Sequence, residues 1–102
     1  MSDELVVEEP GGTVSVPAAA LERIVSRAAE RVDGSRARRR RGVEIALDGG
    51  AATVSLQLAA RYGVVLPQLV ERVQAEVREV LETMFELDVK RVDVTVEEPV
   101  ER

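Results

Sequence analysis

The sequence contains no cysteine and no histidine, and its aromatic residues are one tyrosine and one phenylalanine. These absences exclude disulfide bonds, thiolate nucleophiles, histidine general bases and the commonest zinc ligands. No apolar run approaches the ~20 residues of a membrane-spanning helix. The start, Met1–Glu4, is acidic where a secretory signal would be basic. We therefore expect a cytoplasmic protein without catalytic activity, without a cofactor and without a metal site.

The net charge of −5 hides an uneven distribution of basic residues. Five of the fourteen basic residues fall in one short tract, namely Arg36, Arg38, Arg39, Arg40 and Arg41. Elsewhere nine basic residues face nineteen acidic ones, a balance of −10. An acidic body with one basic tract can hold a polyanion only through that tract.

The length of 102 residues is that of one domain with a modest core. Residues 1–11 are acidic and run into a Pro-Gly-Gly sequence, which predicts a flexible acidic tail. Residues 12–97 form the single domain in this interpretation. Residues 98–102 are predicted to be a second charged tail.

Residues 53–96 carry most of the large apolar side chains. The stretch 53–62 alternates apolar and polar residues, which is typical of a strand with one buried face. After Gly63, apolar residues recur three and four apart along a predicted helix that Pro67 opens: Leu66, Leu69, Val70, Val73, Val77, Val80, Leu81 and Met84. Alternation returns in a final strand at Val92, Val94 and Val96.

The first half of the domain repeats this arrangement. A short strand, Thr13–Val16, precedes a helix opened by Pro17. The helix has a buried stripe (Leu21, Ile24, Val25, Ala28, Val32) and a solvent face (Glu22, Arg23, Arg27, Glu30, Arg31). Gly34 is placed to end it. A strand at 43–47 then leads into Asp48-Gly49-Gly50, a hairpin signal.

These elements predict an α+β fold of order βαββαβ. Placing both helices on one face of a small mixed or antiparallel sheet, as a two-layer sandwich, buries both helical stripes. A ferredoxin-like arrangement is the leading topology. In the alternative, Thr13–Val16 is a marginal edge piece and the central hairpin orders a three-stranded sheet.

The arginine tract is the feature of the sequence that most directly indicates a binding partner. It could neutralise the phosphates of nucleic acid or the headgroups of anionic lipid. Alternatively, it is a solvated loop that balances the acidic body. An RNA-binding sheet of this type would stack bases on exposed aromatic residues, whereas Tyr62 and Phe85 each end a predicted buried stripe.

Other candidate sites have simpler explanations. The pairs Glu8-Glu9 and Glu97-Glu98 could contact a hard cation but lack the spacing of a calcium loop, so we interpret them as solvated. Ser26 and Ser35 have no histidine to activate them.

Four segments together resemble the alkaline shock protein family of bacterial envelope stress response proteins. They are Gly12–Pro17, Arg41–Ile45, Tyr62–Pro67 and Leu87–Val96. The most specific part is the Tyr-Gly-Val-x-(apolar)-Pro elbow, followed by a long amphipathic helix and a Lys-x-Val-x-Val strand. The resemblance extends from Gly12 to Val96.

This resemblance implies a non-catalytic interaction or scaffold protein of Gram-positive bacteria. Such a protein would associate with itself as a homo-oligomer and could be held at the inner face of the membrane by a small membrane-anchoring partner. The family offers no active site to transfer, and no small-molecule substrate is expected. A nucleic-acid or anionic-surface binding module that uses residues 36–41 is the alternative function.

Overall fold

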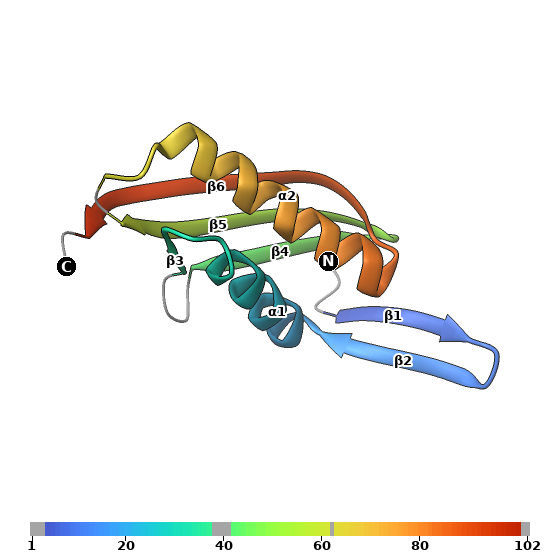
Figure 1. Cartoon of the computed structure of the whole chain (residues 1–102). Helices are drawn as coiled ribbons and strands as arrows, with labels where there is room; N and C mark the ends of the chain where they lie inside the picture. Colours follow the sequence, from blue (N-terminus) through green and yellow to red (C-terminus); the bar gives the residue numbers. More distant parts are fainter. Residues whose placement is uncertain (1–3, 38–41, 62, 101–102) are drawn as a thin grey trace.

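The computed structural model describes residues 4–37, 42–61 and 63–100. Two helices lie on one face of a curved sheet, and a separate hairpin projects from one end (Figure 1). The chain therefore has an α+β fold of order ββαββαβ, with a short extra strand after the first helix. In sequence order the elements are β1 (Glu4–Glu9), β2 (Gly12–Pro17), α1 (Ala18–Glu30), β3 (Ser35–Ala37), β4 (Val43–Asp48), β5 (Ala51–Arg61), α2 (Leu66–Phe85) and β6 (Asp88–Val100).

Strand β5 is the centre of the main sheet. Strands β4 and β3 pair antiparallel with its first and second halves, along the same edge, and β6 pairs parallel with it. Gly49 and Gly50 make the β4–β5 turn at positive φ (56° and 93°), which confirms the predicted hairpin. The parallel pair requires a crossover, and α2 supplies it.

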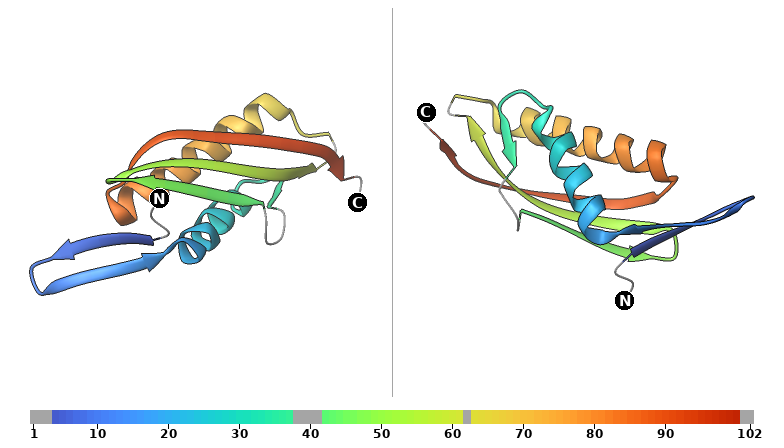
Figure 2. Two further views of the ribbon diagram at one scale, coloured as in Figure 1. Left: turned by 180° about the vertical axis from the view of Figure 1, so that it is seen from behind. Right: turned by 90° about the horizontal axis from the view of Figure 1, so that it is seen from below.

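The core lies between the sheet and the helices, as the views from behind and below show (Figure 2). Alternate residues of β5 are buried, and they include Val54, Leu56 and Leu58 at no more than 1% exposure. Helix α2 contributes its buried stripe, and α1 contributes smaller side chains among its own buried residues, in particular Ala28 and Ala29. The predicted positions of both stripes are confirmed along most of their length.

The ends of α2 have no side-chain caps. Val65 at the N-cap offers no side-chain hydrogen bond, as its apolar side chain predicts, while Pro67 occupies the first turn. At the other end Glu86 adopts a left-handed conformation (φ 54°), and its N–H donates to the Glu82 carbonyl at 3.0 Å. Contacts along its length, which include apolar packing on the sheet and hydrogen bonds from Gln74 and Arg78 to β6, therefore hold this helix in place.

Residues 4–9 are not a tail. The sequence predicts a flexible tail for residues 1–11, and this prediction is wrong for Glu4–Glu9, which pair antiparallel with β2. In the segment 9–12, Pro10 stands second and Gly12 fourth, which is typical of a type I turn. The Pro-Gly-Gly sequence thus joins two strands. The second predicted tail is also shorter than expected, because β6 continues to Val100.

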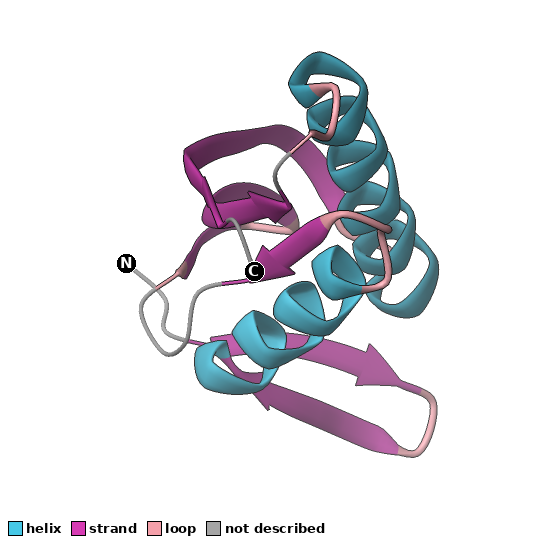
Figure 3. Cartoon of the chain, turned by 60° about the vertical axis from the view of Figure 1, so that its left-hand side comes forward, coloured by secondary structure: helices cyan, strands magenta, loops and turns pink. Residues whose placement is uncertain are grey.

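The leading topology is wrong as well. A ferredoxin-like arrangement would place residues 13–16 in the main sheet, whereas β2 pairs with β1 alone in a two-stranded sheet. The alternative is closer, because the β4–β5 hairpin orders the sheet. However, the short strand at the edge of the main sheet is β3, whereas the alternative places residues 13–16 at the edge. The β1–β2 hairpin lies apart from the main sheet, below α1 in the view of Figure 3.

Candidate functional site

The predicted anion-binding tract lies only in part within the described residues. Arg36 belongs to β3, opposite Ala59, whereas residues 38–41 lie outside the described ranges. On one side of those four residues, Ala37 is opposite Leu58. On the other, Gly42 accepts a hydrogen bond from the Gln57 N–H at 2.7 Å. The chain therefore leaves and rejoins the same edge of β5 at neighbouring residues.

A second row of arginines lies on α1 and on the residue that caps its C-terminal end. Arg23, Arg27 and Arg31 are four residues apart, which places them along one exposed face of the helix. Among the described residues, Arg23 and Arg27 make no ion pair, while Arg31 pairs with Glu76 at 3.5 Å. The sequence predicts that these three side chains face water, and the structure shows in addition that they border a groove.

That groove runs along α1 and between the two helices. One hollow, of about 250 Å³, is lined by Ala20, Arg23, Ile24 and Arg27. Next to it, a hollow of about 230 Å³ is lined by Ile24, Arg27, Ala28, Arg31, Val80 and Met84. The two share Ile24 and Arg27. We call this surface the α1–α2 groove: it has an apolar floor and a row of arginines on one side.

The apolar floor is incompletely covered. Met84 keeps 61% of its surface exposed, although it stands at a position of the α2 stripe that the sequence predicts to be buried. Ile24 and Val80 are half-buried. The reason is geometric, because α1 is shorter than α2 and lacks a large side chain to cover the far end of the stripe.

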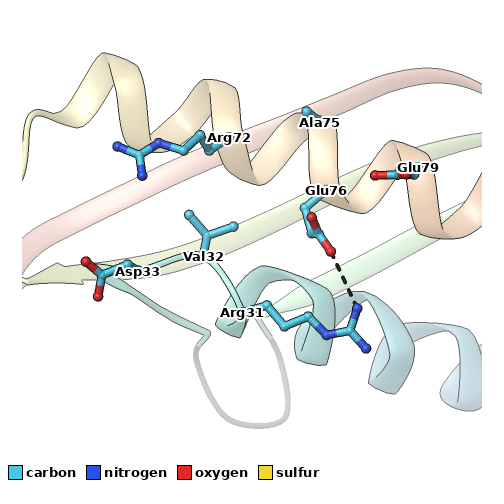
Figure 4. A pocket seen from close by; sticks show the side chains of 7 residues that line it. All are labelled: Arg31, Val32, Asp33, Arg72, Ala75, Glu76 and Glu79. Carbon is cyan, nitrogen blue, oxygen red and sulfur yellow. Dashed lines mark hydrogen bonds and ion pairs between the residues drawn. The ribbon is translucent and has the colours of Figure 1, made fainter.

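Beyond Arg31 the groove opens into a hollow of about 370 Å³ (Figure 4). Its charges are mostly paired. Glu76 points from α2 toward Arg31, and Asp33 accepts two hydrogen bonds from Arg61 at 3.2 and 3.4 Å. These pairs are exposed, so each contributes at most about 1 kcal/mol. Carboxylates held by arginines in open solvent do not form a general acid and base pair.

The described residues also contain no group of three acidic side chains that could hold a metal ion. None of the described helices is long and apolar enough to cross a membrane. The apolar floor and the arginines of the α1–α2 groove are chemically suited to contact a partner by apolar burial and charge.

Two hydrogen bonds from side chains of α2 partly block the edge of the sheet that β6 forms. The side chain of Gln74 donates to the Val92 carbonyl at 3.0 Å, and Arg78 donates to the Val89 carbonyl at 2.6 Å. Both carbonyls belong to β6, which has β5 as its strand neighbour. With two of its carbonyls taken by α2, β6 offers a poorer edge for the addition of another strand.

The architecture defines the class of protein as a two-layer α+β domain with a basic and apolar groove on its helical side. A family model covers residues 18–100 of this chain, and the chain belongs to that family: the alkaline shock protein 23 family, which has a cell envelope-related function. The match begins at the first residue of α1, so it includes both helices and the main sheet but not the β1–β2 hairpin.

Solved structures with a similar fold are only distantly related in sequence. One MamM-CTD double variant has a TM-score of 0.58 and 18% identity, over 83% of this chain and 96% of that one. The zinc form of another MamM CTD variant has a TM-score of 0.55 and 17% identity, over 82% and 88%. At this identity the likeness concerns the fold alone. No curated protein sequence matches the chain.

Proposed function

We propose that this protein is a non-catalytic scaffold of the bacterial cell-envelope stress response. It acts by associating with itself and by docking on a membrane-linked partner, which brings it to the inner face of the cell membrane. Membership of a family with a cell envelope-related function supports the envelope part of this proposal.

One observation supports the mode of action. Large apolar side chains remain exposed at several places in the described structure: Val6, Val14, Val65, Leu66 and Met84. Apolar surface bordered by charged residues is typical of sites that bind other proteins. By contrast, the hollow beyond Arg31, which is lined by Asp33, Glu76 and Glu79, is open, and Asp33 and Glu76 are paired with arginines. Binding is therefore the function that this surface serves best.

Size-exclusion chromatography with light scattering tests self-association over a wide range of protein concentration. We expect a mass above that of the 11.1 kDa chain, rising with concentration. Affinity purification from the native host, with and without detergent, tests docking and should recover a membrane protein. A strict monomer that recovers no membrane protein would contradict the proposal.

The second candidate is binding to nucleic acid or anionic lipid through Arg36 and Arg38–Arg41. It is supported by the register of the sheet, in which Ala37 and Gly42, the described residues on either side of residues 38–41, lie opposite Leu58 and Gln57, neighbours on β5. Binding should weaken steeply with salt and disappear when the five arginines become glutamine. Absence of binding to RNA, DNA and acidic vesicles at low salt would end this hypothesis.

A further inference from the structure

Only part of the β1–β2 hairpin, which we call the arm, contacts the core of its own chain. Leu5, at its base, is 8% exposed and joins the core. Val6, on one face of the arm, and Val14, opposite Val7 on the other face, keep 51% and 49% of their surface exposed. An isolated two-stranded hairpin has marginal stability in water. Each face of the arm therefore has one apolar side chain that its own chain leaves about half uncovered.

The arm and the α1–α2 groove carry opposite charges. Residues 4–17 include three glutamates, Glu4, Glu8 and Glu9, and no basic residue. The groove has Arg23 and Arg27 along its side, and within the described residues neither has an acidic partner. Glu8, which lies on the exposed face of β1 with Val6, has no ion pair there either. Such complementarity guides association and fixes register.

We propose that the arm of one copy docks in the α1–α2 groove of a second copy. This inference rests on the proposed function, since it gives the self-association a defined contact. Val6 packs against the apolar floor at Ile24 and Met84, and Glu8 pairs with Arg27. Because each copy has one arm and one groove, a reciprocal exchange closes a symmetric dimer.

The dimensions of the two surfaces agree. A six-residue strand is about 20 Å long, and a helix of the length of α1, 13 residues, is also about 20 Å long. Side chains on one face of a strand repeat every ~6.6 Å, and helical residues four apart repeat every ~6 Å. With Val6 over the apolar floor, Glu8 thus falls about one helical turn along the row of arginines.

The arm does not reach the groove of its own chain. It leaves the N-terminal end of α1 and extends away from both helices, whereas the groove continues along α1 toward Arg31 (Figures 1 and 2). A second copy avoids this restriction, because its arm can approach the groove from outside. The contact is therefore between chains.

Charge reversal at each side of the contact tests the proposal on the full chain. Glu8→Arg places like charges together in a dimer of that variant, and Arg27→Glu does the same. Each variant alone should dimerise at least about tenfold more weakly than the wild type. In an equimolar mixture, one copy of each variant restores both contacts, so a heterodimer of wild-type affinity should form. Glu71→Arg on α2 and Arg91→Glu on β6 make the same charge changes at exposed positions outside the groove and should leave dimerisation unchanged.

Sedimentation velocity measures the dimerisation constants, and circular dichroism at the same concentrations checks that each variant is folded. Rescue in the mixture would establish the arm–groove contact, since a variant that had lost its fold could not be rescued. A wild-type dimer that neither reversal weakens would overturn this inference and leave the proposed self-association intact. A wild type that is monomeric at every concentration would overturn both.

Discussion

In the two-layer body, Leu58 and Leu69 are fully buried between the sheet and the helices. In the arm, Val6 and Val14 keep about half of their surface in solvent, although they belong to regular strands. Both regions are amphipathic. The difference is that the body has two layers, which bury each other's apolar faces, whereas the arm is a single layer that contacts the rest of the chain at its base. The first region should govern folding and the second should govern association.

The largest expected effect is in the body. Val77 on α2 is fully buried, and Val77→Asp would place an unpaired carboxylate in the core. The cost of about 4 kcal/mol or more is comparable to the whole stability of a small domain. We expect circular dichroism to show an unfolded chain. Glu79→Ala, on the exposed face two residues away, should change stability by less than about 0.5 kcal/mol. Equal melting temperatures for the two variants would contradict the assignment of faces.

A milder pair compares the two regions directly. Leu58→Ala leaves a cavity in the body and should lower the free energy of unfolding by about 2–5 kcal/mol. Val14→Ala removes methyl groups that are half in solvent and should cost less than about 1 kcal/mol. Urea unfolding at a concentration where the protein is monomeric measures both. A cost at Val14 as large as that at Leu58 would show that the arm is part of the folding unit.

Most elements of the body were predictable from the sequence, whereas of the arm only the strand at residues 13–16 was, for a physical reason. Long periodic patterns identify β5 and α2, because one face of each is buried along its whole length. In the arm, Leu5-Val6-Val7 is a short apolar run without alternation. Pro10 and the two glycines that follow are as typical of the boundary between a flexible tail and a domain as they are of a turn between strands. Strand β3 has three residues and no apolar alternation at all.

The groove was missed for a related reason. Arg23, Arg27 and Arg31 have the spacing of an ordinary solvated helix face, and the sequence places them there correctly. What makes the face a groove is the neighbouring α2, whose Val80 and Met84 lie beside α1. That proximity is part of the tertiary structure, and the residue pattern of either helix alone does not reveal it. The arginine tract at 36–41, by contrast, stands out in composition, but most of it lies outside the described residues.

A third prediction compares two glycines. At Gly34, in the turn after α1, φ is +93°, and a Cβ would lie 2.8 Å from Cγ2 of Val64. Gly34→Ala should therefore cost about 1–3 kcal/mol, because both the backbone and the neighbouring side chain are strained. Val64→Ala in the same chain should remove the clash and recover part of this loss. Gly11→Ala, at the tip of the arm with no atom within 4 Å, should have almost no effect in thermal unfolding. Similar losses at the two glycines would show that the arm is as constrained as the body.

The smallest effect concerns a charge pair at the surface of the body. A hydrogen bond from Lys90 to Asp88, 2.7 Å long, and the charge of that carboxylate raise the pKa of Lys90 above its ordinary value. Because this pKa is higher in the folded than in the unfolded chain, the pair stabilises the fold below the unfolded pKa of lysine. That contribution is lost as the pH rises through the folded pKa, in the alkaline range. Asp88→Asn should lower the pKa of Lys90, which NMR titration of its side chain can follow. Both side chains are more than half exposed, so the melting temperature at neutral pH should barely change. A large loss of stability there would mean that surface charge, and not the apolar core, holds the body together.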